Sequence, residues 1–135
     1  MKWIIASACM LAIACAERSP APVAVRIGED ACASCRMTVV SIKTAAQIIS
    51  SGDEPLIFDE LGCLRTYLAA HPARAGARVF VADHRTGEWV DAAVAVFTKS
   101  ALSTPMSSGL LAHASSQSRD ADPDAAGGTP AKVLP

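Results

Sequence analysis

The stretch Leu56-Ile57-Phe58-Asp59-Glu60-Leu61-Gly62-Cys63-Leu64 predicts a change from strand to helix within one short run. Its three leading apolar residues follow the turn-type sequence Gly52-Asp53-Glu54-Pro55, which is typical of a short buried strand after a loop. Asp59 is suited to cap the helix that follows. The carboxylate of Glu60 in the first turn would interact favourably with the positive end of the helix dipole. This run therefore predicts a short buried strand that is followed at once by a helix.

The helix should bury one apolar face and end near His71-Pro72, because proline disfavours helical backbone in the residue before it. Three residues at helical spacing form that face: Leu61, Leu64 and Leu68. Gly62 costs about 1 kcal/mol relative to alanine inside a helix, and close approach of another backbone would explain it. Two interpretations are open for Cys63: it is either a small buried apolar residue or a third sulfur beside Cys32 and Cys35.

The rest of the chain alternates apolar, strand-type runs with turns. Strand-type runs occupy 38–42, 44–49, 78–83, 88–90 and 110–112, with a turn at 84–87, whereas 91–99 is ambiguous between strand and short helix. This order predicts an α+β fold with small antiparallel sheets and one main helix, and it is compatible with two similar ββα-type halves.

With 135 residues, the chain is expected to form one small domain. Residues 1–15 are typical of an export leader, and Leu11-Ala12-Ile13-Ala14-Cys15 resembles the bacterial lipoprotein processing site, with Cys15 lipidated. We expect a flexible tether at 16–27, a metal-binding domain at 28–114 and a disordered tail at 115–135. The net charge of −1 gives no basic footprint for nucleic acid, so membrane attachment would depend on the lipid.

Candidate metal ligands gather in Cys32-Ala33-Ser34-Cys35-Arg36-Met37. Thiolate and thioether are soft donors and together favour Cu(I). If the chain becomes extended here, Cys35 and Met37 lie on one side of a strand, with Cα atoms roughly 7 Å apart. The charge of Arg36 favours the thiolate at Cys35.

Three thiols remain if Cys9 is removed with the leader and Cys15 is acylated. An odd number of thiols in an oxidising compartment favours metal or redox chemistry over purely structural disulfides. The main alternative is a thiol-disulfide oxidoreductase using Cys32 and Cys35, although no helix is expected after this motif. A structural zinc module would need Cys63 and a histidine as well.

Six blocks of sequence together resemble the nitrous oxide reductase accessory lipoproteins, the NosL family, over residues 30 to 114. In chain order they are Cys32-Ala33-Ser34-Cys35-Arg36-Met37, Ala45-Ala46-Gln47, Phe58-Asp59-Glu60-Leu61-Gly62-Cys63-Leu64, Val81-Ala82-Asp83, Glu88-Trp89-Val90-Asp91-Ala92 and Thr104-Pro105-Met106-Ser107-Ser108-Gly109. The sequence departs from the family pattern at Ser107, where many members have glycine, and at Ala114 after His113, near Ala112, where an aromatic residue is common.

The resemblance implies a non-enzymatic, membrane-anchored periplasmic lipoprotein. It would deliver Cu(I) to the copper-sulfide centre of nitrous oxide reductase, or to another periplasmic copper enzyme. It implies Cys35, Met37 and Met106 as ligands, and Cys32 is a further candidate. His113 is the best histidine candidate because it follows the Met106 loop, and a surface role is its alternative.

Overall fold

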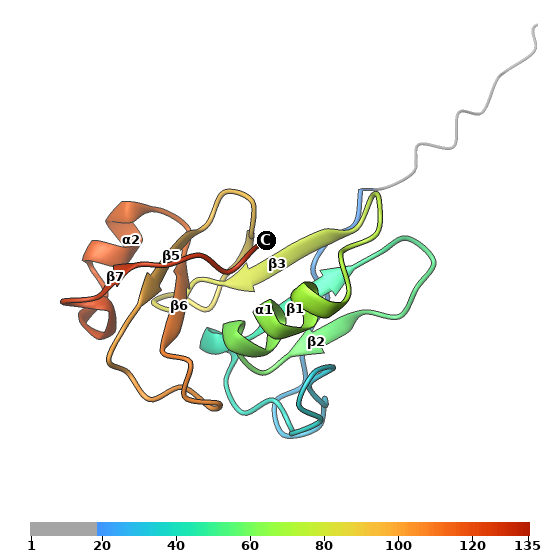
Figure 1. Cartoon of the computed structure of the whole chain (residues 1–135), viewed down its shortest axis with the longest axis horizontal. Coiled ribbons are helices and arrows are strands. Elements are labelled where there is room, and N and C mark those ends of the chain that lie inside the picture. The colour runs from blue at the N-terminus through green and yellow to red at the C-terminus, as the bar shows by residue number, and fades with distance from the viewer. Residues whose placement is uncertain (1–18) are drawn as a thin grey trace, which may run out of the picture.

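The computed structural model describes residues 19–135, which form two small antiparallel sheets and one main helix (Figure 1). The first sheet has the order β2-β1-β3-β4, and its strands are β1 (Ala46–Ile49), β2 (Leu56–Phe58), β3 (Arg78–Ala82) and β4 (Trp89–Asp91). The second has the order β6-β5-β7, and its strands are β5 (Val96–Lys99), β6 (Leu110–His113) and β7 (Thr129–Pro130). The predicted α+β fold class is confirmed.

Helix α1 (Leu61–Ala70) begins directly after β2, and the three leucines predicted to form its inner face are all buried. The helix ends at His71, as the following proline predicts. The predicted hairpin is also present, because β3 and β4 pair antiparallel with Phe80 opposite Asp91. None of the helices within residues 19–135 has the length and apolar character needed to cross a bilayer.

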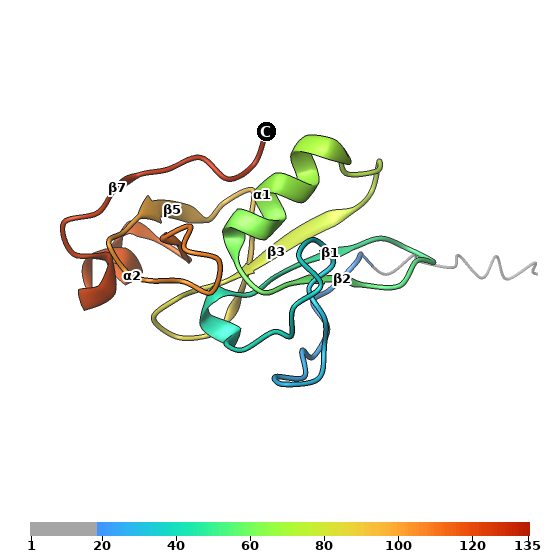
Figure 2. The ribbon, with the colours of Figure 1, turned by 60° about the horizontal axis from the view of Figure 1, so that its bottom comes forward.

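The two faces of the first sheet are covered by different parts of the chain. Ala46 and Ile48 of β1 point to the α1 side, where they join a core that also includes Leu110 and Ala112 of β6. On the opposite face, Ala45 packs against Val39 and the N-terminal segment. Figure 2 shows α1 on one side of the sheet and the blue N-terminal segment on the other.

Two local predictions before α1 are wrong. Residues 38–42 form no strand: Thr38 makes one isolated bridge to Ala31, and η1, a short 3₁₀ helix at Ile42–Thr44, precedes β1. Asp59 does not cap the helix, because Glu60 occupies the cap position without a side-chain hydrogen bond. The carboxylate of Asp59 instead accepts a hydrogen bond from the backbone N–H of Val40, at 2.9 Å.

Both terminal segments pack more closely than their composition predicts. Residues 115–135 are not disordered: they form α2 (Ser116–Asp120), η2 (Pro123–Ala125) and β7, and Val133 is buried in the core. The expected tether at 16–27 is docked over its described part, since the backbone of Val23 exchanges two hydrogen bonds with the Gln47 side chain. Small residues and proline therefore did not prevent packing at either end.

Asp83 joins the turn after β3 to the C-terminal part of the fold. One carboxylate oxygen accepts the turn N–H groups of Arg85 and Thr86, and the other accepts the Ala114 N–H and the Ser118 hydroxyl. Burial acts to raise the pKa of Asp83, but these four donors outweigh it and lower the pKa to about 2. Its charge therefore stabilises the fold.

We expect Asp83→Asn to lower the free energy of unfolding at pH 7 by about 2 kcal/mol, the value of its pKa shift. Because the folded pKa is depressed, this contribution is present above the ordinary value of 3.8 and is lost as the pH falls toward 2. Urea unfolding from pH 7 to pH 2 measures both effects. Asp53→Asn, which removes an exposed ion pair with Arg74, is the control and should change stability by less than about 0.5 kcal/mol. Equal losses in the two variants would contradict this role.

Candidate metal centre

Three cysteine sulfurs meet where the loop before β1 touches the start of α1. The Sγ atoms of Cys32, Cys35 and Cys63 all lie within 4.8 Å of one another, and all three residues are free thiols. Cys32 and Cys63 are buried, whereas Cys35 is partly exposed. Both readings of Cys63 are therefore correct, since it is a core residue and the third sulfur of the cluster.

A tight turn brings the first two sulfurs together. Cys32 donates its N–H to the carbonyl of Met37 at 2.8 Å, and its own carbonyl accepts the N–H of Arg36 at 3.0 Å. Arg36 has a φ of 65°, in the left-handed region that non-glycine residues seldom adopt. The chain between Cys35 and Met37 is therefore turned rather than extended, and the strand geometry predicted for this pair is wrong.

Two hydrogen bonds fasten this loop to the corner between β2 and α1. The N–H of Ala33 donates to the carbonyl of Ile57 at 2.7 Å, and Val40 is held by Asp59 as described above. Cys63 is the third residue of α1, so the same corner that anchors the loop also supplies the third sulfur. Asp59 thus helps to hold the cysteine-bearing loop against the start of α1. Its place in the sequence does not predict this role.

The three thiols differ in acidity. Burial acts to raise the pKa of Cys32, but backbone N–H groups of Cys35, Asp59 and Ser34 donate to its sulfur and hold its pKa below that of an ordinary thiol. Burial raises the pKa of Cys63, and negative charge on Cys32 raises it further. Cys32 is therefore the first of this pair to become a thiolate, and Cys63 keeps its proton in the metal-free site.

The cluster can hold a metal ion. Three sulfurs around one ion, each at about 2.3 Å from it, would lie roughly 4 Å apart in a trigonal arrangement. The observed sulfurs fall within a range that needs little movement to reach this geometry. Cys63 lies in the first turn of α1, at the positive end of the helix dipole, which favours the negative charge of bound thiolates.

The two methionines predicted as ligands are both exposed. Met37 is 55% exposed two residues after Cys35, and Met106 is 45% exposed in the loop before β6. Ser108 of that loop approaches α1 closely, because a Cβ on Gly62 would lie 2.6 Å from the Ser108 Cβ. The Met106 loop therefore lies against the helix turn that carries Gly62 and Cys63. The crowding at Gly62 comes from side-chain atoms of Ser108 and Glu60, so the prediction of a close backbone approach is wrong.

The remaining predicted residues are placed elsewhere. His113 is fully buried, so a surface role is wrong, and it groups with His84 and Asp122 rather than with the cysteines. His84, which the sequence suggested as an ordinary turn residue, is also buried. Cys15 and the leader at 1–15 lie outside the described residues.

The close contact at Gly62 predicts that Gly62→Ala lowers stability even though alanine is the better helix former. The added Cβ would lie 2.5 Å from a Glu60 carboxylate oxygen as well as against Ser108. Overpacking of about 1–3 kcal/mol should exceed the propensity gain of about 1 kcal/mol. Urea unfolding measures the change, and Ala69→Gly on the exposed part of α1 calibrates the propensity effect. A stabilised Gly62→Ala protein would contradict the contact.

The acidity order of the thiols predicts a stepwise thiolate titration in the metal-free protein. The ultraviolet absorbance of thiolate should rise first from Cys32 and only at much higher pH from Cys63. Cys32→Ser should remove the early rise, whereas Cys63→Ser should leave it in place. Circular dichroism checks that both variants remain folded. An unchanged early rise in Cys32→Ser would show that the backbone donors do not set the order.

Comparison of this chain with protein-family models, with curated proteins and with solved structures finds no match. The cysteine cluster is the feature of the described structure with direct chemical content, because it gathers three soft donors in one place.

Proposed function

We propose that this protein binds Cu(I) at Cys32, Cys35 and Cys63 and passes it to an acceptor protein. The single observation that carries the proposal is the convergence of three thiols within 4.8 Å. Sulfur donors select soft ions, and a three-coordinate site suits Cu(I) better than Zn²⁺, which wants four closed ligands. No histidine or carboxylate joins this cluster within the described residues, so the sulfur set has no fourth ligand of that kind.

Cu(I) binding at this cluster is coupled to proton release. Cys32 and Cys63 lie in the apolar core, where each uncompensated charge is costly. The ion offsets the negative charge of the Cys32 thiolate, and each further thiol that binds it loses its proton. Copper affinity should therefore fall as the pH falls, because protons compete for the same sulfurs.

The exposed methionines supply an entry and exit route in this proposal. Met37 and Met106 present thioethers to solvent, and Cys35 is the one partly exposed thiol of the cluster. A thioether binds Cu(I) without losing a proton, so an incoming ion can be captured there and then move to the buried thiols. Release reverses the route when an acceptor supplies competing sulfur or imidazole ligands.

The resemblance to the NosL family supports the acceptor and the location. We propose that the chain works as a lipid-anchored periplasmic protein, with Cys15 modified, and that its acceptor is nitrous oxide reductase or another periplasmic copper enzyme. Transfer needs no covalent bond to form or break, so the proposal does not include catalysis.

A thiol-disulfide oxidoreductase is the competing function. The lowered pKa of Cys32 favours it, because a thiolate is the attacking species in disulfide exchange. The burial of Cys32 opposes it, because a substrate disulfide cannot reach a fully buried sulfur. The motif also lies in a turn rather than at the start of a helix, so it lacks the local structure of thioredoxin-type sites.

The copper proposal predicts one equivalent of Cu(I) bound per chain, measured by competition with a Cu(I) chelator under anaerobic conditions. Each of Cys32→Ser, Cys35→Ser and Cys63→Ser should weaken binding by at least about tenfold, the loss that even an outer-shell substitution causes at other metal sites. Met37→Leu combined with Met106→Leu should slow transfer to a chelator more than it weakens affinity.

The matched control for the cysteine variants is Ser34→Ala, which lies in the same loop and removes no sulfur. It should bind copper as the unmodified protein does. Unchanged Cu(I) affinity in the variant with all three cysteines replaced would overturn the proposal, and so would turnover of a dithiol substrate in metal-free protein.

A further inference from the structure

A second group of potential ligands lies away from the cysteines, between the two sheets and the C-terminal segment. His84 Nδ1 and His113 Nε2 lie 2.8 and 2.9 Å from the same carboxylate oxygen of Asp122. One ligand atom from each residue falls within 4.8 Å of those from the other two. All three residues are at most 5% exposed, so this group lies in the interior of the protein.

Three separate elements supply these side chains. His84 follows β3, His113 ends β6, and Asp122 stands between α2 and η2. The backbone N–H of His84 donates to the carbonyl of Ala112 at 2.8 Å, which fixes it beside β6. The second carboxylate oxygen of Asp122 accepts the N–H of Asp124 at 3.0 Å, so the oxygen facing the histidines is held in place.

The carboxylate of Asp122 lies buried beside two imidazoles. Within residues 19–135, these imidazoles are its ion-pair partners, and no lysine or arginine reaches it. A divalent cation held by the same three side chains would balance the carboxylate charge in this buried position.

The donor set fits a borderline divalent ion. Imidazole nitrogen and carboxylate oxygen are common zinc ligands, at about 2.0–2.2 Å from the ion. Neighbouring ligands in a tetrahedral site then lie roughly 3.3–3.5 Å apart. The present separations are shorter, so the histidines need to move about half an ångström away from Asp122 to admit an ion.

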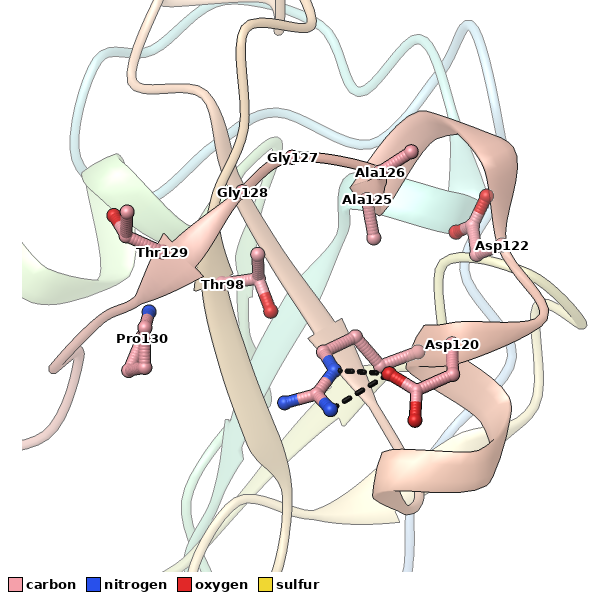
Figure 3. A pocket seen from close by; sticks show the side chains of 10 residues that line it. Thr98, Asp120, Asp122, Ala125, Ala126, Gly127, Gly128, Thr129 and Pro130 are labelled. Carbon is pink, nitrogen blue, oxygen red and sulfur yellow. Dashed lines mark hydrogen bonds and ion pairs between the residues drawn. The ribbon is translucent and has the colours of Figure 1, made fainter.

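A pocket reaches one of the three residues. Asp122 lines a pocket of about 350 Å³ together with Thr98 and the glycines at 127 and 128 (Figure 3). The one cationic side chain among the residues that line it, Arg119, is already paired with Asp120. The two histidines are not among the lining residues, so they lie deeper than this pocket.

We propose that His84, His113 and Asp122 form a second metal site, for a divalent cation of the Zn²⁺ class. It does not depend on the copper proposal, because its ligands are nitrogen and oxygen and none of the three cysteines takes part. An ion there would tie β6 to the C-terminal segment. The competing explanation is that a proton on one imidazole, rather than a metal, balances Asp122.

The test is titration of the metal-free full chain with Co²⁺, a spectroscopic substitute for zinc. Binding at the histidine site should give visible bands without the intense near-ultraviolet bands of cobalt-thiolate. Asp122→Asn and His84→Gln should each weaken this sulfur-free binding at least tenfold. His71→Gln, which changes an exposed histidine at the end of α1, is the matched control and should leave it unchanged.

A measurement on the unmodified chain covers the case in which a variant fails to fold. Zn²⁺ should shift the imidazole nuclear magnetic resonance signals of His84 and His113, leave those of His71 in place, and raise the thermal midpoint of unfolding. Sulfur-free cobalt binding that is absent, or that survives Asp122→Asn, overturns the second site. Imidazole signals that respond to pH but not to Zn²⁺ also overturn it, in favour of the proton. Each of these results leaves the copper proposal standing.

Discussion

The arrangement of the candidate metal site depends on backbone N–H groups that converge on the sulfur of Cys32. Cys32 lies fully buried, yet N–H groups from its own loop and from Asp59 donate to it. The loop and the strand-helix corner are thereby joined through a cysteine side chain. Without these donors a buried thiolate would be costly, and the loop would lose one of its attachments to the sheet. The same contacts that make the sulfur acidic also hold the turn in place.

The parts of the fold that the sequence predicts are those where local pattern and tertiary packing agree. The leucines of α1 repeat at helical spacing and the hairpin of β3 and β4 has a clear turn, so both elements form as expected. The run at 38–42 has strand-type residues, but its backbone makes hydrogen bonds with Gly28, Asp30 and Asp59 instead of with a neighbouring strand. Intrinsic strand preference is weak where no partner strand is available.

The C-terminal segment shows why composition misjudges order. Residues 115–135 are rich in small and polar residues, yet Ser115 and Asp122 cap the helices that follow them, and Val133 enters the core. Asp83 and the two buried histidines provide the polar partners that hold this segment, and they come from β3 and β6. Such long-range polar contacts leave no periodic signal in the sequence, so the histidine-aspartate group could not be predicted from it.

The candidate metal site was predictable in its donor type but not in its geometry. Spacing within the motif identified the sulfurs of Cys32 and Cys35, whereas the left-handed backbone at Arg36 removed the assumed alignment of Cys35 with Met37. The third inner donor is Cys63, supplied by α1, and both thioethers remain at the surface. This division has a chemical consequence, because thiols must lose protons to bind a metal and thioethers need not. In the proposed function, the buried thiols of unequal acidity would retain the ion and the exposed thioethers would exchange it, so retention and transfer would use different side chains.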